Sequence, residues 1–185
     1  MKNNFKNVLP IISLLIFSAV FLISGCSETV KVLDQGIKGP QLIVNPDTVR
    51  LGVAHMKDTK IVFSGSGFEP GDSVFIRLLD VSANGEKADL SIASADVEKN
   101  GTFNTEVEIL TKISDFLRAS LGSNEKNETI IIVTNPPMPA GEYTAQAVSM
   151  LSDKKAECTL HVKDPSLMDR LKDWIGTLLG KIVKK

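Results

Sequence analysis

The sequence predicts a mainly β protein, a β-sandwich that carries a short helical insert and a C-terminal amphipathic helix. Between residues 41 and 163, apolar and polar side chains alternate with period two, which is typical of half-buried strands. Turn-forming pairs such as Asn100-Gly101 and Ala140-Gly141 separate these runs. After Pro165 the period changes to 3.6. With 185 residues, the chain has room for one modest domain.

The first 25 residues have the three parts of a secretory signal. Lys2 and Lys6 give a cationic start, and an apolar run follows over residues 8–23. This run is shorter than a comfortable membrane-spanning helix. The small residues Ser24 and Gly25 then precede Cys26. We therefore expect residues 1–25 to be a signal peptide.

The end of this leader, Leu22-Ile23-Ser24-Gly25-Cys26, resembles the lipobox of bacterial lipoproteins. The resemblance implies that diacylglycerol is attached to the thiol of Cys26 and that the chain is cut just before it. Ser27 follows, without an Asp, which implies sorting to an outer membrane if the cell has one. An ordinary signal peptide, or an N-terminal membrane helix with a chance cysteine, is the alternative.

Residues 26–40 show no period that would fix a strand or a helix. We expect a lipidated tether there. About 14 extended residues would reach roughly 45 Å from the lipid surface, which would separate the domain from the headgroups.

The sandwich is expected over residues 41–164. Alternation is clearest in residues 102–109, where Phe103 and Val107 share one face and Glu106 and Glu108 the other. The apolar run 129–134 predicts a central strand that is buried on both faces. In all, about eight strands are expected, at residues 42–51, 60–63, 74–79, 90–97, 102–109, 129–134, 143–147 and 158–162.

Residues 110–121 break this rhythm. Apolar residues stand there at helical spacing, at Leu110, Ile113, Phe116, Leu117 and Leu121, and Gly122 follows. The pattern predicts a short helix that crosses from one sheet to the other. We expect its apolar stripe to cover the sandwich edge.

Several motifs resemble those of bacterial immunoglobulin-like envelope domains, of the TIG type or a related one. They are residues 64–74 (SGSGFEPGDSV), Asp96 with residues 100–103 (NGTF), and residues 139–145 (PAGEYTA). The likeness covers about 120 residues and implies an immunoglobulin-like sandwich, and it says little about function. Gly141-x-Tyr143 also has the form of a tyrosine corner, with Ala145 where an antibody domain carries a cysteine.

Residues 165–185 are expected to form a C-terminal amphipathic helix, which Ser166 and Asp169 begin with a capping box. Five basic and two acidic side chains lie between residues 166 and 185. The candidate contact residues are Leu167, Leu171, Trp174, Ile175, Leu178, Leu179, Ile182, Lys181, Lys184 and Lys185. Three arrangements stay open: the helix packs on its own sandwich, lies in a membrane interface, or docks on a partner protein or a second copy.

Catalytic and metal sites find little support in the sequence. His161 alternates with Leu160 and Val162, so it should face away from Cys158, and His55 falls in an expected loop. No ligand cluster has a metal-binding spacing, and no glycine-rich loop has the lysine that a phosphate site needs. We expect no catalytic activity and no cofactor.

The net charge and the expected export signal restrict the classes of function that the protein can have. The chain has 21 basic and 22 acidic residues, so a nucleic-acid partner is not expected. The sequence thus predicts a binding or structural module of the bacterial cell envelope, anchored in the membrane through Cys26. The alternative is a membrane-associating or membrane-perturbing factor that acts through residues 166–185.

Overall fold

A computed structural model describes residues 30–83 and 86–185, and it is mainly β, as predicted. The predicted signal peptide and Cys26 lie outside the described residues. The strands of the sandwich are β1 (Gln41–Asn45), β2 (Thr48–Arg50), β3 (Val62–Ser66), β4 (Ser73–Ala83), β5 (Glu86–Asp96), β6 (Phe103–Glu106), β9 (Gly141–Ser149) and β10 (Lys155–Lys163).

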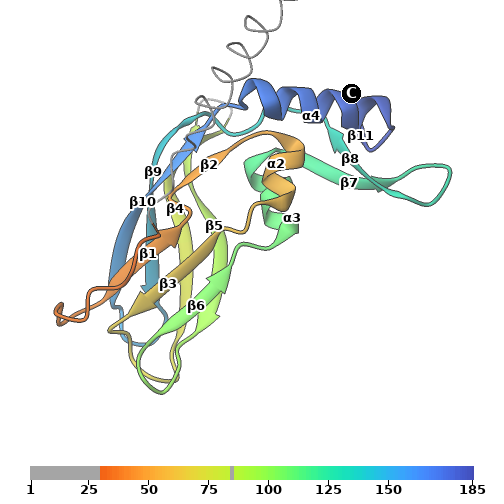
Figure 1. Cartoon of the computed structure of the whole chain (residues 1–185). Coiled ribbons are helices and arrows are strands. Elements are labelled where there is room, and N and C mark those ends of the chain that lie inside the picture. Colours follow the sequence, from red (N-terminus) through yellow and green to blue (C-terminus); the bar gives the residue numbers. More distant parts are fainter. Residues whose placement is uncertain (1–29, 84–85) are drawn as a thin grey trace, which may run out of the picture.

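These strands form two sheets, as Figure 1 shows. One has the order β1-β3-β6 and the other the order β2-β10-β9-β4-β5. All pairings are antiparallel except that of β2 with β10, which is parallel. Side chains of both sheets meet in one core, which includes Val44, Phe63, Ile76, Ala147 and Leu160, all fully buried.

Most residues of the eight expected strands lie in strands of the structure, with three corrections. Residues 107–109 lie beyond the end of β6, and residues 129–133 form a strand outside these two sheets. The first expected run is divided in two. Residues 42–51 form β1 and β2, and the Asn45-Pro46 peptide bond between them is cis. The division lets the two halves join different sheets. β1 pairs with β3, whereas β2 pairs with β10.

A second group of elements gathers at one end of the sandwich, and we call it the cap (Figure 1). It contains three helical segments, α2 (Val53–Asp58), α3 (Ile109–Thr111) with the π-helix η3 (Lys112–Phe116), and α4 (Leu167–Leu178). It also contains a third sheet of order β11-β8-β7, made of β7 (Ala119–Ser123), β8 (Thr129–Val133) and β11 (Ile182–Lys184). The cap thus joins the insert between β6 and β9 to the C-terminal segment.

The cap corrects the prediction for residues 110–121. Helical structure ends at Phe116, and Leu121 lies on β7, which pairs with β8. Ile113, Phe116 and Leu117 are buried as expected, but Leu110 and Leu121 are exposed. A chain reversal at Arg118, whose φ is +48°, ends the helix before the predicted apolar stripe is complete.

Two further predictions are corrected at the cap. His55 belongs to helix α2 and not to a loop. The C-terminal helix stops at Leu178, because Gly180, with φ +67°, turns the chain and residues 182–184 pair in parallel with β8. The predicted capping box is present, since the Ser166 hydroxyl accepts a hydrogen bond from the Asp169 amide and the Asp169 carboxylate accepts one from the Ser166 amide.

The segment before β1 lies against the sandwich. The side-chain amide of Asn45 exchanges two hydrogen bonds with the backbone of Lys31, at 2.8 and 2.9 Å. The Lys31 ammonium group also lies 2.8 Å from a carboxylate oxygen of Asp47. The side-chain amide of Gln41 likewise exchanges two hydrogen bonds with the backbone of Asp34. The described part of the expected tether is therefore attached to the domain from Lys31 onward.

Candidate functional site

Helix α4 is attached to the rest of the cap by its polar side. The residues of this helix that are not exposed are Asp169, Asp173 and Gly176. At 3.6 residues per turn, they share one face. The hydrophobic residues of α4 fall on the opposite face. This arrangement is the reverse of the usual one, in which an amphipathic helix buries its apolar stripe.

Asp173 makes the longest-range polar contact of this interface. Its two carboxylate oxygens accept hydrogen bonds from the backbone amides of Val53 and Ala54, at 3.0 and 2.9 Å. These amides belong to the first turn of α2, and Gly52, the residue before them, has no side chain that could cap them. Asp173 therefore caps α2 from a position about 120 residues further along the chain, as a local N-cap residue would.

Asp169 is the most buried residue of α4, with 4 % of its surface exposed. Its Cβ lies so near Gly52 that a methyl group on Gly52 would approach it to 2.6 Å. Burial raises the pKa of this carboxyl group, but the hydrogen bonds from Ser166 and the charges of His55 and Arg50 outweigh burial and hold the pKa below its ordinary value. The nearest of these charges is the His55 imidazole, whose Nδ1 lies 3.6 Å from the carboxylate. Asp169 is thus stabilised as a buried anion.

The C-terminal half of α4 packs closely on β11. A Cβ atom on Gly176 would meet the Ile182 side chain at 2.7 Å. Ile182 itself is 5 % exposed and belongs to the main core. The turn that follows α4 therefore folds back beneath the helix and seals its docked side.

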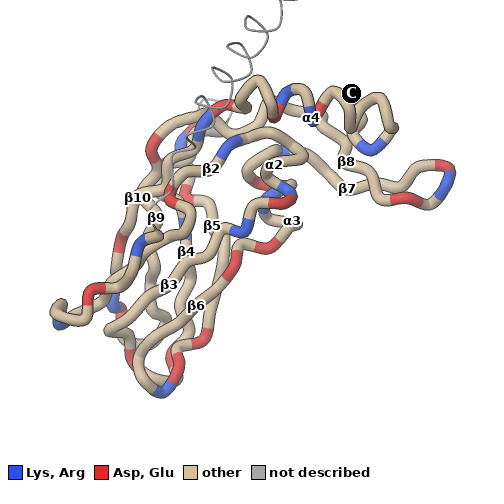
Figure 2. The backbone as a smooth tube through the Cα atoms, viewed as in Figure 1, with Lys and Arg blue, Asp and Glu red and all other residues tan. Residues whose placement is uncertain are grey.

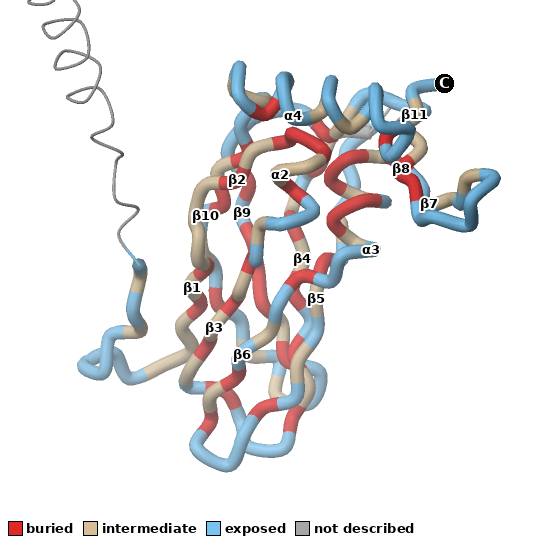
Figure 3. Tube along the Cα trace, turned by 45° about the vertical axis from the view of Figure 1, so that its right-hand side comes forward, coloured by how far each residue is buried: buried red, intermediate tan, exposed pale blue. Residues whose placement is uncertain are grey.

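Because the polar side is docked, the apolar face of α4 is open to solvent. Figure 3 shows the helix almost entirely as exposed chain on the outside of the cap. Its single tryptophan, Trp174, is 58 % exposed, and Leu167 is 86 % exposed. The whole exposed set is Leu167, Met168, Leu171, Trp174, Ile175, Leu178 and Leu179, which we call the outer face of α4.

The charges of this segment are divided in the same way. Both acidic residues of the segment, Asp169 and Asp173, are engaged in the docked interface. All five basic residues, Arg170, Lys172, Lys181, Lys184 and Lys185, are exposed. Figure 2 shows the basic positions along α4 and near the end of the chain. The exposed side chains of residues 166–185 are therefore apolar or cationic, apart from the hydroxyl of Thr177.

Most of the sequence-predicted contact residues lie on this surface. Six belong to the outer face, and Lys181, Lys184 and Lys185 are exposed beyond its end. Ile182 is a correction, because it lies in the core and on β11. Met168 completes the outer face beyond the predicted set, and its helical spacing is the signal that identifies it. Cys26 lies outside the described residues.

Within the described residues, the histidines and the cysteine do not assemble into a catalytic group. His161 lies 3.2 Å from a carboxylate oxygen of Glu142 at the surface of the sandwich. Burial raises the pKa of the Cys158 thiol to about 12, so the thiolate that a nucleophile requires is absent near neutral pH. No three His, Cys, Asp or Glu side chains in residues 30–83 and 86–185 gather as a metal site.

Neither the length of the helices nor the similarity to known proteins assigns a function to this chain. Among the helices that the structure describes, none is long and apolar enough to cross a membrane. No protein-family model matches the sequence, and no curated protein matches it. Solved structures that align include the β-glucosidase from Listeria innocua in complex with glucose and with isofagomine, at 12 and 13% identity and TM-scores of 0.34 and 0.35. The chain spans 16% of that enzyme, and 67% of this chain is covered.

Proposed function

We propose that this protein is a non-catalytic module of the bacterial cell envelope that is lipid-anchored at Cys26 and makes a second contact with the same membrane through the outer face of α4. The second contact fixes the orientation of the domain, and the acyl chains supply the attachment. The sandwich then serves as the part that projects from the membrane and binds or supports other envelope components.

One observation carries this proposal: α4 docks through Asp169, Asp173 and Gly176 and leaves seven large apolar side chains in water. A contiguous exposed apolar surface marks an interaction site. Membrane-interface helices combine such a surface with basic residues beside it and with tryptophan at headgroup depth. Trp174 lies on the outer face, and the exposed charges around it are cationic. These positive charges favour an anionic lipid surface, rather than an uncharged groove on a protein, as the binding partner of the outer face.

The lipid anchor at Cys26 and the outer face of α4 lie close enough along the fold to reach the same membrane. Lys31, whose backbone is held by Asn45, is the fifth residue after Cys26. An extended chain of that length spans about 17 Å. Asn45 ends β1, and β2 then leads to Gly52, which touches Asp169 on α4. A short lipidated segment therefore attaches on the side of the sandwich that leads directly to the cap.

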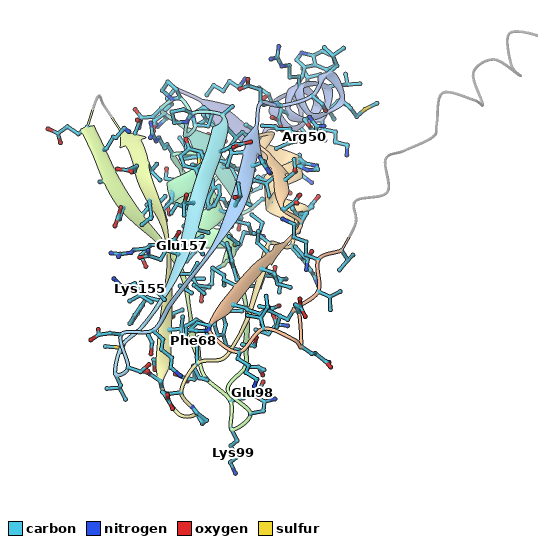
Figure 4. All side chains as sticks on the ribbon, turned by 90° about the vertical axis from the view of Figure 1, so that its left-hand side faces the viewer. Arg50, Phe68, Glu98, Lys99, Lys155 and Glu157 are labelled. Carbon is cyan, nitrogen blue, oxygen red and sulfur yellow. The ribbon has the colours of Figure 1, made fainter. Side chains whose placement is uncertain are left out.

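The opposite end of the sandwich would then point away from the membrane. Figure 4 shows Arg50 beside α4, and Lys99 at the far end of the molecule. Lys99 lies in the turn between β5 and β6. Loops at that end are the part of the domain that remains accessible to partners when α4 lies on a bilayer.

The proposal includes an immunoglobulin-like identity for the sandwich. In support, β1, β3 and β6 share one sheet and β4, β9 and β10 the other, the division that A, B, E and C, F, G strands have in that fold. Tyr143, near the start of β9, donates a hydrogen bond of 2.7 Å from its hydroxyl to the backbone carbonyl of Pro139. A tyrosine corner has this form. The cap would then be an insertion between the E and F strands, completed by the C-terminal segment.

Vesicle co-sedimentation of the unlipidated chain from Ser27 to Lys185 tests the second contact. We expect it to bind vesicles that contain anionic phosphatidylglycerol and to bind phosphatidylcholine vesicles far less. The variant Leu171→Glu/Leu178→Glu should lose binding, because it places two charges on the outer face. Its thermal midpoint should stay near that of the wild type, since both side chains are exposed.

The matched control is Met150→Glu/Leu151→Glu, which adds the same two charges at exposed apolar residues (60 and 82 %) between β9 and β10. It should bind vesicles as the wild type does. Equal binding by the wild type and the α4 variant would refute the membrane contact. Absence of vesicle binding by the folded wild-type chain would likewise refute it.

A further inference from the structure

The cap encloses a pocket of about 270 Å³ on the docked side of α4. It lies between α2, the α3–η3 segment, the β7–β8 pair and β11, and Gly176 of α4 closes it on one side. Ligand cavities range from about 300 to 1,000 Å³, so this one has room for a narrow ligand only. Because it is bounded by Gly176, it is separate from the outer face, which lies across the helix.

The walls of this pocket are mostly apolar. They are formed by the side chains of Ala54, Ile109, Ile113, Leu121, Ile131 and Ile182, with Thr129 beside them. Ile113, Ile131 and Ile182 are buried and form the deep part, whereas Ile109 and Leu121 are 44 and 40 % exposed. The pocket thus runs from the core surface to solvent, and it would shield a methylene chain from water along its length.

Among the described residues, two lysines are the only charged ones that line the pocket. Lys57 comes from the last turn of α2 and Lys181 from the turn before β11. Both are exposed, and neither forms an ion pair with any described residue. The lining contains no carboxylate. A mostly apolar pocket with two lysines and no acid in its lining is complementary to an anionic head on an aliphatic chain.

We propose that this pocket binds a single-chain anionic amphiphile, a medium-chain fatty acid of about ten carbons, with the chain among the isoleucines and the carboxylate near Lys57 and Lys181. A diacyl phospholipid is excluded as the occupant by the volume, which does not admit two chains. The proposal is independent of the membrane contact of α4, since it concerns the other side of that helix. It goes beyond the proposed function by assigning the cap a ligand.

The test uses the chain from Ser27 to Lys185 in vesicle-free buffer, with decanoate below its micelle concentration as the probe and isothermal titration calorimetry as the readout. We expect saturable binding of decanoate. Decyltrimethylammonium, which has a similar chain and a cationic head, should not bind. The variant Lys57→Glu/Lys181→Glu should raise the Kd for the probe about tenfold or more, because two attractive charges become repulsive.

Three controls separate the pocket from other sites. Lys99→Glu/Lys155→Glu makes the same charge change at exposed positions outside the pocket lining and should leave the Kd unchanged. Leu121→Trp enlarges a half-exposed wall residue and should abolish probe binding without loss of thermal stability. Leu171→Glu/Leu178→Glu, on the outer face, should bind the probe normally.

Two outcomes would overturn the proposal. One is unchanged probe affinity in both the Lys57/Lys181 and the Leu121 variants. The other is loss of probe binding in the outer-face variant alone, which would mean that the fatty acid lies on the exposed face of α4. Neither outcome bears on vesicle binding, so the membrane contact and the pocket can fail separately.

Discussion

Replacement of Asp173 tests whether α4 is held to the domain by its polar side. The carboxylate of Asp173 accepts two backbone hydrogen bonds, at 3.0 and 2.9 Å, from the first turn of α2. Asp173→Ala removes both and leaves the two amides without a partner. A lost N-cap costs about 0.5–2 kcal/mol, and a hydrogen bond to a charged group contributes about 1.5–3 kcal/mol when it is buried. Because Asp173 is half-buried, we expect a loss of about 2 kcal/mol.

Thermal unfolding followed by far-ultraviolet circular dichroism measures this loss. For a domain of this size, 1 kcal/mol shifts the midpoint by about 2–4 °C, so Asp173→Ala should lower it by about 4–8 °C. Asp173→Asn keeps one acceptor oxygen and should lose about half as much. Asp164→Ala removes an exposed acid just before α4 and serves as the matched control. A midpoint for Asp173→Ala within about 1 °C of the control would contradict this account of docking.

Three further predictions concern the same interface and the partly buried thiol of Cys158. In urea unfolding, Gly52→Ala should destabilise the protein by about 1–3 kcal/mol, because its methyl group would lie 2.6 Å from Asp169 Cβ. Gly39→Ala, which has open space around it, should be nearly neutral and serves as the control. The pKa of Asp169 lies below its ordinary 3.8, so the carboxylate stabilises the fold above that pH, and this contribution is lost as the pH falls through the lower folded-state pKa. From about pH 5 to pH 2, the urea midpoint should therefore fall less for Asp169→Asn than for the wild type. Equal falls would count against this assignment. Partial burial raises the pKa of the Cys158 thiol to about 12, so it should react with a disulfide reagent at about pH 8 far more slowly in the native than in the unfolded protein, and equal rates would count against this assignment.

Local patterns were enough to predict most strands of the sandwich and the start of α4. Alternation over residues 102–109 places Phe103 in the core and Glu106 at the surface, as observed. The capping box needs only Ser166 and Asp169, which are three residues apart, so the sequence itself contains the whole motif. The hydrogen bond between Tyr143 and Pro139 is equally local.

The cap depends on contacts that no local pattern contains. The six-residue helix α2 has no capping side chain of its own and takes its cap from Asp173, which is about 120 residues away. β11 is three residues long and exists because it pairs with β8. Helical periodicity continues through Ile182, but the pairing of Ile182 with Ile131 overrides it. Gly180 was the one local signal that could have marked the end of α4.

The orientation of α4 could not be predicted from its amphipathic pattern either. A hydrophobic stripe normally indicates the buried side of a helix. Here Asp169 and Asp173 are satisfied by backbone amides and a neighbouring imidazole, so the polar side can be docked without unpaired charge. The same contacts leave the apolar side exposed. The sequence contains the stripe, and only the fold determines which way it points.

The fluorescence of Trp174 tests the membrane contact most directly, because it is the single tryptophan of the chain and lies on the outer face of α4. The account predicts that phosphatidylglycerol vesicles shift its emission to the blue and that lipids brominated near the glycerol end of their chains quench it. Leu171→Glu/Leu178→Glu should abolish both effects. Emission that stays at the wavelength of a solvent-exposed indole, while the wild-type chain co-sediments with the vesicles, would contradict the proposed contact.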